Sequence, residues 1–199
     1  MCYFLGFRSE SLKLHKGQPL YVTGHSLGGA LAMLATRMLV SDSIGACYTY
    51  GCPRAGDDEF FKGIKTPVYR VVNAADGVVR VPFGDGFSLF LAVLRAIPIN
   101  GTYQLSEWLR KNFLSYTHYG NLVFLSDASN VVGDDGIMFK DLVVKKSPNI
   151  FWRFSIVSRR LLRTRLKAAG ADHSILDYSQ KLLAHARRRN RNCDLGTGD

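Results

Sequence analysis

One serine of the chain lies in a pattern that suits a nucleophile. Residues 24–28 read Gly-His-Ser-Leu-Gly, a G-x-S-x-G pattern centred on Ser26, between a predicted strand and a predicted helix. A serine on such a sharp turn is exposed for attack on a carbonyl carbon, and Gly24 and Gly28 are expected to keep strand and helix clear of it. Because a helix N-terminus favours negative charge, the N–H of Leu27 is expected to donate to an oxyanion.

A serine hydroxyl needs a base and a carboxylate to become a good nucleophile. Two of the five histidines, His118 and His173, follow Ser26 and remain as candidate bases. His173 is favoured because it lies on a predicted turn before a helix that Ser174 could cap. His15 precedes the pattern and His185 lies in a predicted basic helix. His25 adjoins Ser26, and its side chain is expected to project differently from that of the serine.

The acid is expected just beyond the carboxyl end of a strand, where open α/β sheets build their sites. Asp76 follows the predicted strand 68–73 by three residues. The acidic residues at 57–59 suit the first turn of a helix instead. Asp76 and His173 therefore complete the predicted triad, with His118 as the alternative base.

Strands and helices are expected to alternate along the chain. β-branched and aromatic runs predict strands, and Ala/Leu/Met-rich runs predict helices. Such alternation implies right-handed βαβ units, hence a mostly parallel sheet flanked by helices in a single domain, residues 1–199. The order Ser, Asp, His is that of an α/β-hydrolase. The predicted strands are 20–23, 47–50, 68–73 and 122–125, and the predicted helices are 27–39, 57–63, 87–96, 150–168 and 174–190.

Five segments, in order, resemble motifs of the class 3 lipases, the fungal-type triacylglycerol lipases. They are YVTGHSLGGALA at 21–32, YTYGCPRAG at 48–56, YRVVNAAD at 69–76, YTHYG at 116–120, and Asp172-His173-Ser174 with Tyr178. The resemblance spans about residues 18–190. It implies an α/β-hydrolase fold, a triad of Ser26, Asp76 and His173, and acyl glycerides or similar lipid esters as substrates. It also implies that His118 is not the catalytic histidine and that no cofactor or metal is needed.

The sequence departs from the family's pattern in two places. The family has Asp-x-Val-Pro-x-Val-Pro after its aspartate, whereas Val79 replaces the first proline here, so a looser loop is expected. The family also places several strands, a lid helix and a second oxyanion donor ahead of the nucleophile, but only 19 residues precede Leu20. The upstream strands are therefore expected to be missing, and the strand starting at Leu20 to form a homodimer through its free edge.

Composition narrows the function classes. Hydrophobic residues make up 47% and charged residues 21% of the 199 residues, which excludes a disordered chain. The longest apolar stretch, 87–99, is too short to span a bilayer. The first ten residues lack the basic leader and long apolar run of a secretory signal, so a cytoplasmic location is the default expectation. Four cysteines without metal-ligand spacing predict buried or free thiols rather than a zinc site.

Most of the net charge of +10 lies in the C-terminal third. The arginines there are not interleaved with exposed aromatic residues, so nucleic acid is not an expected partner. Within the predicted helix 150–168, Phe154, Val157 and Leu161 form an apolar stripe. This helix either covers the core or contacts an anionic lipid surface. The cations that flank the stripe are Arg159, Arg160, Arg163, Arg165 and Lys167.

Two function hypotheses from different classes follow. The first is a serine carboxylester hydrolase that cleaves lipid esters through an acyl-enzyme intermediate. The second is a catalytically impaired lipase-fold fragment that binds lipid or membrane surfaces, because loss of one oxyanion donor typically costs about 10²- to 10³-fold in turnover. A serine peptidase or acyltransferase would use the same triad, so the reaction class rests on the resemblance.

Overall fold

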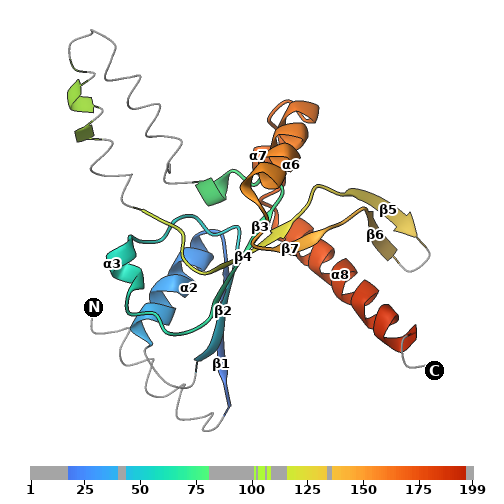
Figure 1. Ribbon diagram of the computed structural model, residues 1–199, viewed down its shortest axis with the longest axis horizontal. Coiled ribbons are helices and arrows are strands. Elements are labelled where there is room, and N and C mark those ends of the chain that lie inside the picture. Colours follow the sequence, from blue (N-terminus) through green and yellow to red (C-terminus); the bar gives the residue numbers. More distant parts are fainter. Residues whose placement is uncertain are drawn as a thin grey trace.

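The computed structural model describes residues 18–39, 44–80, 101, 103–105, 107–108, 116–133 and 136–195 (Figure 1). Its strands are β1 (Leu20–His25), β2 (Ile44–Tyr50), β3 (Val68–Asn73), β4 (Asn121–Leu125), β5 (Ser129–Gly133), β6 (Gly136–Lys140) and β7 (Val144–Lys146). Its helices are α2 (Leu27–Met38), α3 (Asp58–Phe61), α6 (Ile150–Arg163), α7 (Ala168–Ala171) and α8 (Ile175–Leu195), with a 3-10 turn, η1, at Val78–Arg80.

A five-stranded sheet in the order β1-β2-β3-β4-β7 forms the centre of the described structure. The strands from β1 to β4 are parallel, and β7 pairs antiparallel with β4. In Figure 1, α2 and α3 lie on one side of this sheet and α8 on the other. The predicted mostly parallel α/β sheet flanked by helices is therefore confirmed.

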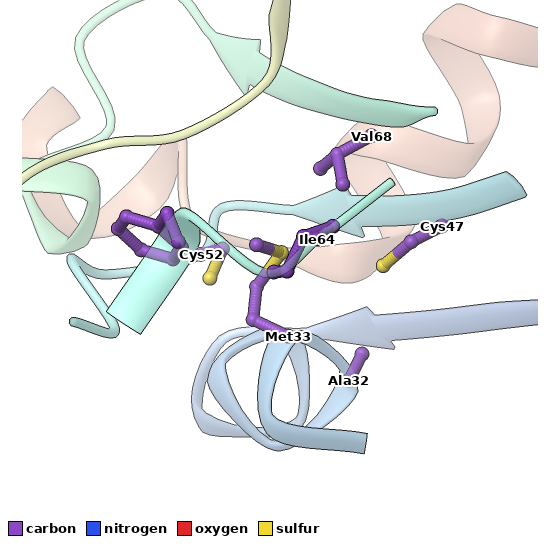
Figure 2. Close-up of a cluster of buried hydrophobic side chains, with 7 residues drawn as sticks. Ala32, Met33, Cys47, Cys52, Ile64 and Val68 are labelled. Atoms are coloured by element: carbon purple, nitrogen blue, oxygen red, sulfur yellow. The ribbon is translucent and has the colours of Figure 1, made fainter. Parts of the chain in front are cut away.

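The face of the sheet covered by α2 holds the first core. Successive strand residues point to opposite faces, so Cys47 of β2 and Val68 of β3 share the face on which Ala32 and Met33 of α2 pack. Figure 2 shows these side chains pointing toward one another between helix and strands. The same alternation continues along β3, where Val72 packs in a second core with Val157 of α6.

The opposite face is covered by α8. Val71 of β3 and Leu125 of β4 pack against Tyr178, whose side chain is fully buried. Because β3 contributes to cores on both faces, its carboxyl end is fixed from both sides. This is the end from which the chain continues to Asp76.

The predicted helix 150–168 is two helices in the structure. α6 ends at Arg163, and the following backbone reverses through positive φ angles of 49° at Arg165 and 67° at Leu166 before α7 begins. Thr164 stabilises the break, because its hydroxyl donates to the carbonyl of Arg160 and accepts from the N–H of Ala168.

Other boundaries differ less. α8 extends beyond the predicted residue 190 to Leu195, and the predicted helix 87–96 lies outside the described residues.

Three strands, β5, β6 and β7, were not predicted from the sequence. Among the described residues β5 and β6 pair only with each other, and Figure 1 shows this hairpin projecting from the sheet. No helix within the described ranges is long and apolar enough to cross a bilayer.

Candidate active site

Ser26 occupies a strained turn between β1 and α2. Its φ of 56° and ψ of −128° lie in a region that non-glycine residues adopt only when their surroundings impose it. The N–H of Ser26 donates to the carbonyl of Tyr50 at 2.9 Å, which ties the turn to the end of β2. The serine is thereby held above the carboxyl edge of the sheet.

The glycines around this turn are not equivalent. A Cβ on Gly24 would lie 2.0 Å from the carbonyl oxygen of Gly28, so Gly24 is needed for the close approach of strand and helix. A Cβ on Gly28 itself would meet nothing within 4 Å, so the prediction that a glycine at this position keeps strand and helix clear of the serine is wrong. A second close approach is found at Gly29, where an added Cβ would lie 2.8 Å from the Cβ of Cys52.

The structure brings the three residues of the predicted triad together. The Oγ of Ser26 lies 2.8 Å from Nε2 of His173. The Nδ1 of His173 lies 2.9 Å from Oδ2 and 3.1 Å from Oδ1 of Asp76. The serine can thus donate to a histidine whose other nitrogen donates to a carboxylate, the geometry that favours the neutral Nδ1–H tautomer of the imidazole.

Asp76 is 1% exposed, and its carboxylate has further donors. The hydroxyl of Tyr178 donates to Oδ2 at 2.7 Å, and the N–H of Val78 donates to Oδ1 at 2.9 Å. Burial, followed by the charge of Asp76, raises the pKa of Tyr178, so its hydroxyl keeps its proton. These donors satisfy a buried carboxylate that would otherwise be costly.

Leu27 is the first residue of α2. Its N–H therefore has no acceptor within the helix. The position beside Ser26 is the one predicted for an oxyanion donor, and the Leu27 side chain is largely exposed.

His118, the alternative base, faces a different group. Its Nε2–H donates to the carbonyl of Val79 at 2.7 Å. Burial, reinforced by the charges of Arg70, Arg54 and Arg153, lowers the pKa of His118 to about 3 against the backbone hydrogen bond. The imidazole is therefore neutral at physiological pH.

His25 contacts the candidate base, which the sequence did not indicate. Its Nε2–H donates to the backbone carbonyl of His173 at 2.8 Å, and the two rings lie 4.6 Å apart. His25 alternates with Gly24 along β1, so its side chain points to the face on which α8 and Tyr178 lie. It thereby fixes the backbone of the loop that carries His173.

Gly51 is a second residue missed as part of the site. Its φ is 55°, and a Cβ there would lie 2.7 Å from Oδ2 of Asp76 and 2.9 Å from Nδ1 of His173. Glycine is the residue that tolerates both the left-handed backbone and this contact. The pattern YTYG, quoted above for its resemblance, was the available signal.

The loop after Asp76 is held by several contacts. η1 contains Val79, which is buried, and the N–H of Gly77 donates to the carbonyl of Ala169 at 2.9 Å. The N–H of Arg80 donates to the carbonyl of Gly77. Residues 77–80 are thus tied to each other and to Ala169, while Val81 and Pro82, the end of the stretch for which a looser loop was expected, lie outside the described residues.

The described cysteines offer no competing nucleophile. Cys47 and Cys52 are free and buried, as expected. Burial raises the pKa of Cys47, and it raises that of Cys52 to about 12, so both thiols are protonated. Within the part of the chain that the structure describes, no group of three His, Cys, Asp or Glu side chains is placed to hold a metal ion.

The fold and the site together define a class of protein. A serine on a strand-turn-helix elbow, hydrogen-bonded to a histidine and an aspartate that follow in this chain order, is the arrangement of α/β-hydrolases. Residues 7–86 match the family described as lipase (class 3). This segment makes up less than half of the chain and contains Ser26 and Asp76; His173 lies beyond it.

Similar proteins carry lipase names. The chain is 41% identical over 93 residues to triacylglycerol lipase OBL1 of Ricinus communis, covering 40% of this chain and 18% of that protein. It is 45% identical over 93 residues to secreted mono- and diacylglycerol lipase 1 of Fusarium solani, covering 43% of this chain and 28% of the relative. The chain thus spans less than a third of the length of either relative.

Among solved structures, the lipase from Rhizopus microsporus var. chinensis aligns with a TM-score of 0.47 and 21% sequence identity. The alignment covers 85% of this chain and 47% of that lipase.

Proposed function

We propose that the chain is a serine carboxylester hydrolase that cleaves lipid esters, of which acyl glycerides are the favoured class. The observation that carries the proposal is the continuous hydrogen-bonded line from Ser26 Oγ through His173 to Asp76. The lipase names of the relatives support an ester of a lipid as the substrate.

In the proposed reaction, Ser26 Oγ attacks the ester carbonyl carbon while its proton passes to Nε2 of His173. The carbonyl oxygen becomes an oxyanion that the Leu27 N–H stabilises. Collapse of this tetrahedral intermediate breaks the bond to the alcohol oxygen, which takes the proton from His173. Water then repeats the sequence on the acyl-enzyme: its proton goes to His173, its oxygen attacks the acyl carbon, and Ser26 regains its hydrogen as the fatty acid leaves.

Asp76 serves this cycle without giving up or taking a proton. Its carboxylate holds the Nδ1–H tautomer of His173 and offsets the positive charge that the imidazole carries after the first transfer. Since Tyr178 and Val78 also donate to it, the carboxylate is fixed in one orientation. Removing such an orienting carboxylate costs about 10⁴-fold in turnover in serine hydrolases of this type.

The surface beside the nucleophile suits an acyl chain. Leu27 adjoins Ser26, Leu31 follows one helical turn later, and Ile175 and Leu176 follow His173; all four side chains are substantially exposed. These exposed apolar side chains, on the helices that begin next to Ser26 and His173, can contact the hydrocarbon part of a lipid ester and remove it from water. This supports a lipid ester over a polar ester.

Turnover of short- and long-chain p-nitrophenyl esters by the wild-type protein and by Ser26→Ala tests the proposal. We expect hydrolysis by the wild-type protein that rises with acyl length up to the solubility limit, and loss of at least 10³-fold in Ser26→Ala with unchanged thermal unfolding. A fluorophosphonate should label the wild-type protein at Ser26 only. Absence of both labelling and turnover in folded protein would favour the impaired, surface-binding alternative.

We also propose that α6 contacts an anionic lipid surface. Its exposed side carries Phe151, Phe154 and Leu162, of which Phe151 and Leu162 are each 80% exposed. Val157 of the predicted stripe instead packs in the core, so the exposed apolar stripe is displaced around the helix. Aromatic and leucine side chains beside cations are typical of helices that lie in a membrane interface.

The cations available for that contact are fewer than the sequence indicated. Arg160 and Arg163 form ion pairs with Asp127, and Arg160 also pairs with Asp172. Arg159, Arg165 and Lys167 remain, and each cation near an anionic bilayer contributes about 1 kcal/mol. Co-sedimentation with vesicles should therefore rise with anionic lipid and fall with salt, and replacing Phe151 and Phe154 by Ser should abolish it. Equal binding to neutral and anionic vesicles contradicts this contact.

We further propose a homodimer through β1. Among the described residues β1 pairs with β2 alone and lies at the edge of the sheet. Tyr21 on this strand is 58% exposed. An edge strand with unpaired backbone groups favours pairing with another strand.

A further inference from the structure

The loops that carry Asp76 and His173 are joined by the residues directly before them. The N–H of Ala75, which precedes Asp76, donates to Oδ2 of Asp172, which precedes His173, at 2.9 Å. Asp172 is 1% exposed. This buried hydrogen bond spans 97 positions of sequence between the two loops.

α6 holds this carboxylate from the other side. Arg160 Nη2 lies 2.7 Å from Oδ1 of Asp172, and its Nε lies 3.3 Å from Oδ2. Two parallel N–H···O contacts of this kind fix the plane of a carboxylate, which a single ammonium group does not do. The hydrogen bond to Asp172 raises the pKa of Arg160 above its usual value. Asp127, 3.0 Å away, also pairs with the guanidinium.

The main chain of Asp172 is fixed as well. The side-chain amide of Asn73, the last residue of β3, donates to the carbonyl of Asp172 at 2.9 Å. Lys181 of α8 donates to the Asn73 side-chain oxygen at 2.7 Å and is itself buried. Asp172 is therefore anchored to β3 through its carbonyl and to both α6 and the Asp76 loop through its carboxylate.

We infer that Asp172 is a positioning residue of the triad and that Arg160 holds its carboxylate in the orientation that binds the Ala75 N–H. This inference rests on the proposed hydrolase function. Asp172 touches neither the substrate nor the reacting atoms. It sets the spacing between the two loops, and with it the 2.9 Å contact between Asp76 and His173.

The consequence for turnover follows from that spacing. Without the carboxylate, the Ala75 N–H loses its buried acceptor, and the two loops lose the link that lies directly beside Asp76 and His173. The hydrogen bond from the Gly77 N–H to the Ala169 carbonyl, farther from His173, is left to join them. A displacement of about 1 Å within a catalytic arrangement costs about 10²-fold in rate. Asp172 is not among the exposed apolar residues proposed to contact the acyl chain, so we expect ground-state binding of the ester to be largely unchanged. The expected signature is a fall in kcat with unchanged KM.

Two substitutions at one position separate positioning from charge. Asp172→Asn retains an oxygen that can accept from the Ala75 N–H, whereas Asp172→Ala retains none. We expect kcat to fall about 100-fold in Asp172→Ala and less than 10-fold in Asp172→Asn, with KM within twofold in both. Equal losses in the two variants, or a loss expressed in KM, would overturn the inference.

Arg160→Lys gives a milder test if Asp172→Ala fails to fold. It keeps the charge and loses the two-point contact, so we expect kcat to fall three- to tenfold. Arg163→Met is the matched control, because Arg163 lies on the same helix, pairs with Asp127 and makes no contact with Asp172. Unchanged kcat in Arg160→Lys, or an equal loss in Arg163→Met, contradicts the inference.

A stability control completes the design. Ile64→Ala opens a cavity in the core that α2 covers, a cluster that contains no residue of the loops carrying Asp76 and His173, and should lower the melting temperature while leaving kcat unchanged. If Ile64→Ala lowers kcat as much as Asp172→Ala, the effect is general destabilisation and the inference is wrong. Activity of the wild-type protein and its loss in Ser26→Ala are measured alongside, so failure of the hydrolase proposal is recognised separately.

Discussion

Replacing Gly51 by alanine should disable the site although the change adds only one methyl group. The residue has a φ of 55°, and its new Cβ would lie 2.7 Å from Oδ2 of Asp76. Ordinary van der Waals contact begins at about 3.4 Å, so the carboxylate or the backbone must move by about 0.7 Å. The same methyl group would lie 2.9 Å from Nδ1 of His173 and wedge apart the pair that it meets.

Two costs are expected from this clash. The left-handed backbone is disfavoured for alanine by about 1 to 2 kcal/mol, and inserting a methyl group into a packed site adds about 1 to 3 kcal/mol. The free energy of unfolding of Gly51→Ala should therefore fall by about 2 to 5 kcal/mol. Because a displacement near 1 Å costs about 10²-fold in rate, turnover by the folded fraction should fall about 100-fold.

Urea unfolding and p-nitrophenyl ester turnover below the transition measure the two effects separately. Gly170→Ala is the matched control, because a Cβ there meets nothing within 4 Å and the residue lies in α7. Helical alanine is favoured over glycine by about 0.5 to 1 kcal/mol, so this variant should be slightly more stable and equally active. If Gly51→Ala keeps more than half of the wild-type turnover, the tight packing derived for Asp76 and His173 is wrong.

Three further predictions follow from other contacts. Burial lowers the pKa of His118 to about 3 in the folded protein, whereas an unfolded histidine has a pKa of about 6.5. Between these pH values the unfolded chain binds one more proton, so the free energy of unfolding should fall as the pH drops from about 6.5 toward 3. In denaturant titrations, His118→Gln should reduce that slope by up to about 1.4 kcal/mol per pH unit. Tyr178→Phe removes the donor to Asp76 and the acceptor of the Asn73 N–H, so unfolding should require about 1 to 3 kcal/mol less; an unchanged urea midpoint contradicts this. Light scattering should show a dimer that Tyr21→Lys converts to monomer, because charged side chains block edge pairing; a wild-type monomer at all concentrations rules out the β1 interface.

The sequence predicted those parts of the protein whose physics is local. β1, α2, β2 and β3 follow from β-branched runs and an apolar helix separated by glycine turns, and their order in a parallel sheet follows from the alternation. The positions of Ser26, Asp76 and His173 could be proposed because each occupies a recognisable place: an elbow, the end of a strand, and a loop before a helix.

What the sequence missed depends on contacts between distant residues. The role of Gly51 appears only when Asp76 and His173 converge on it; the YTYG pattern marks the position but does not show which side chains it faces. Arg160 was predicted to belong to a solvated or lipid-facing row of cations, but Asp127 and Asp172 bind it. The end of α6 was missed because Thr164 and two residues in the left-handed region break a sequence with good helical propensity.

The order of the three triad residues along the chain also decides when the site can be assembled during synthesis. His173 lies 97 positions after Asp76 and 147 after Ser26. Ribosomes add about 5 to 20 residues per second, so roughly 5 to 20 s separate the emergence of the aspartate from that of its histidine. Tyr178, Lys181 and the rest of α8 come later still. Under the proposed hydrolase function, a chain built in this order cannot form the contact between Ser26 and His173 until residue 173 has been added, and the buried contacts of α8 that hold Asp76 and Asn73 form after that.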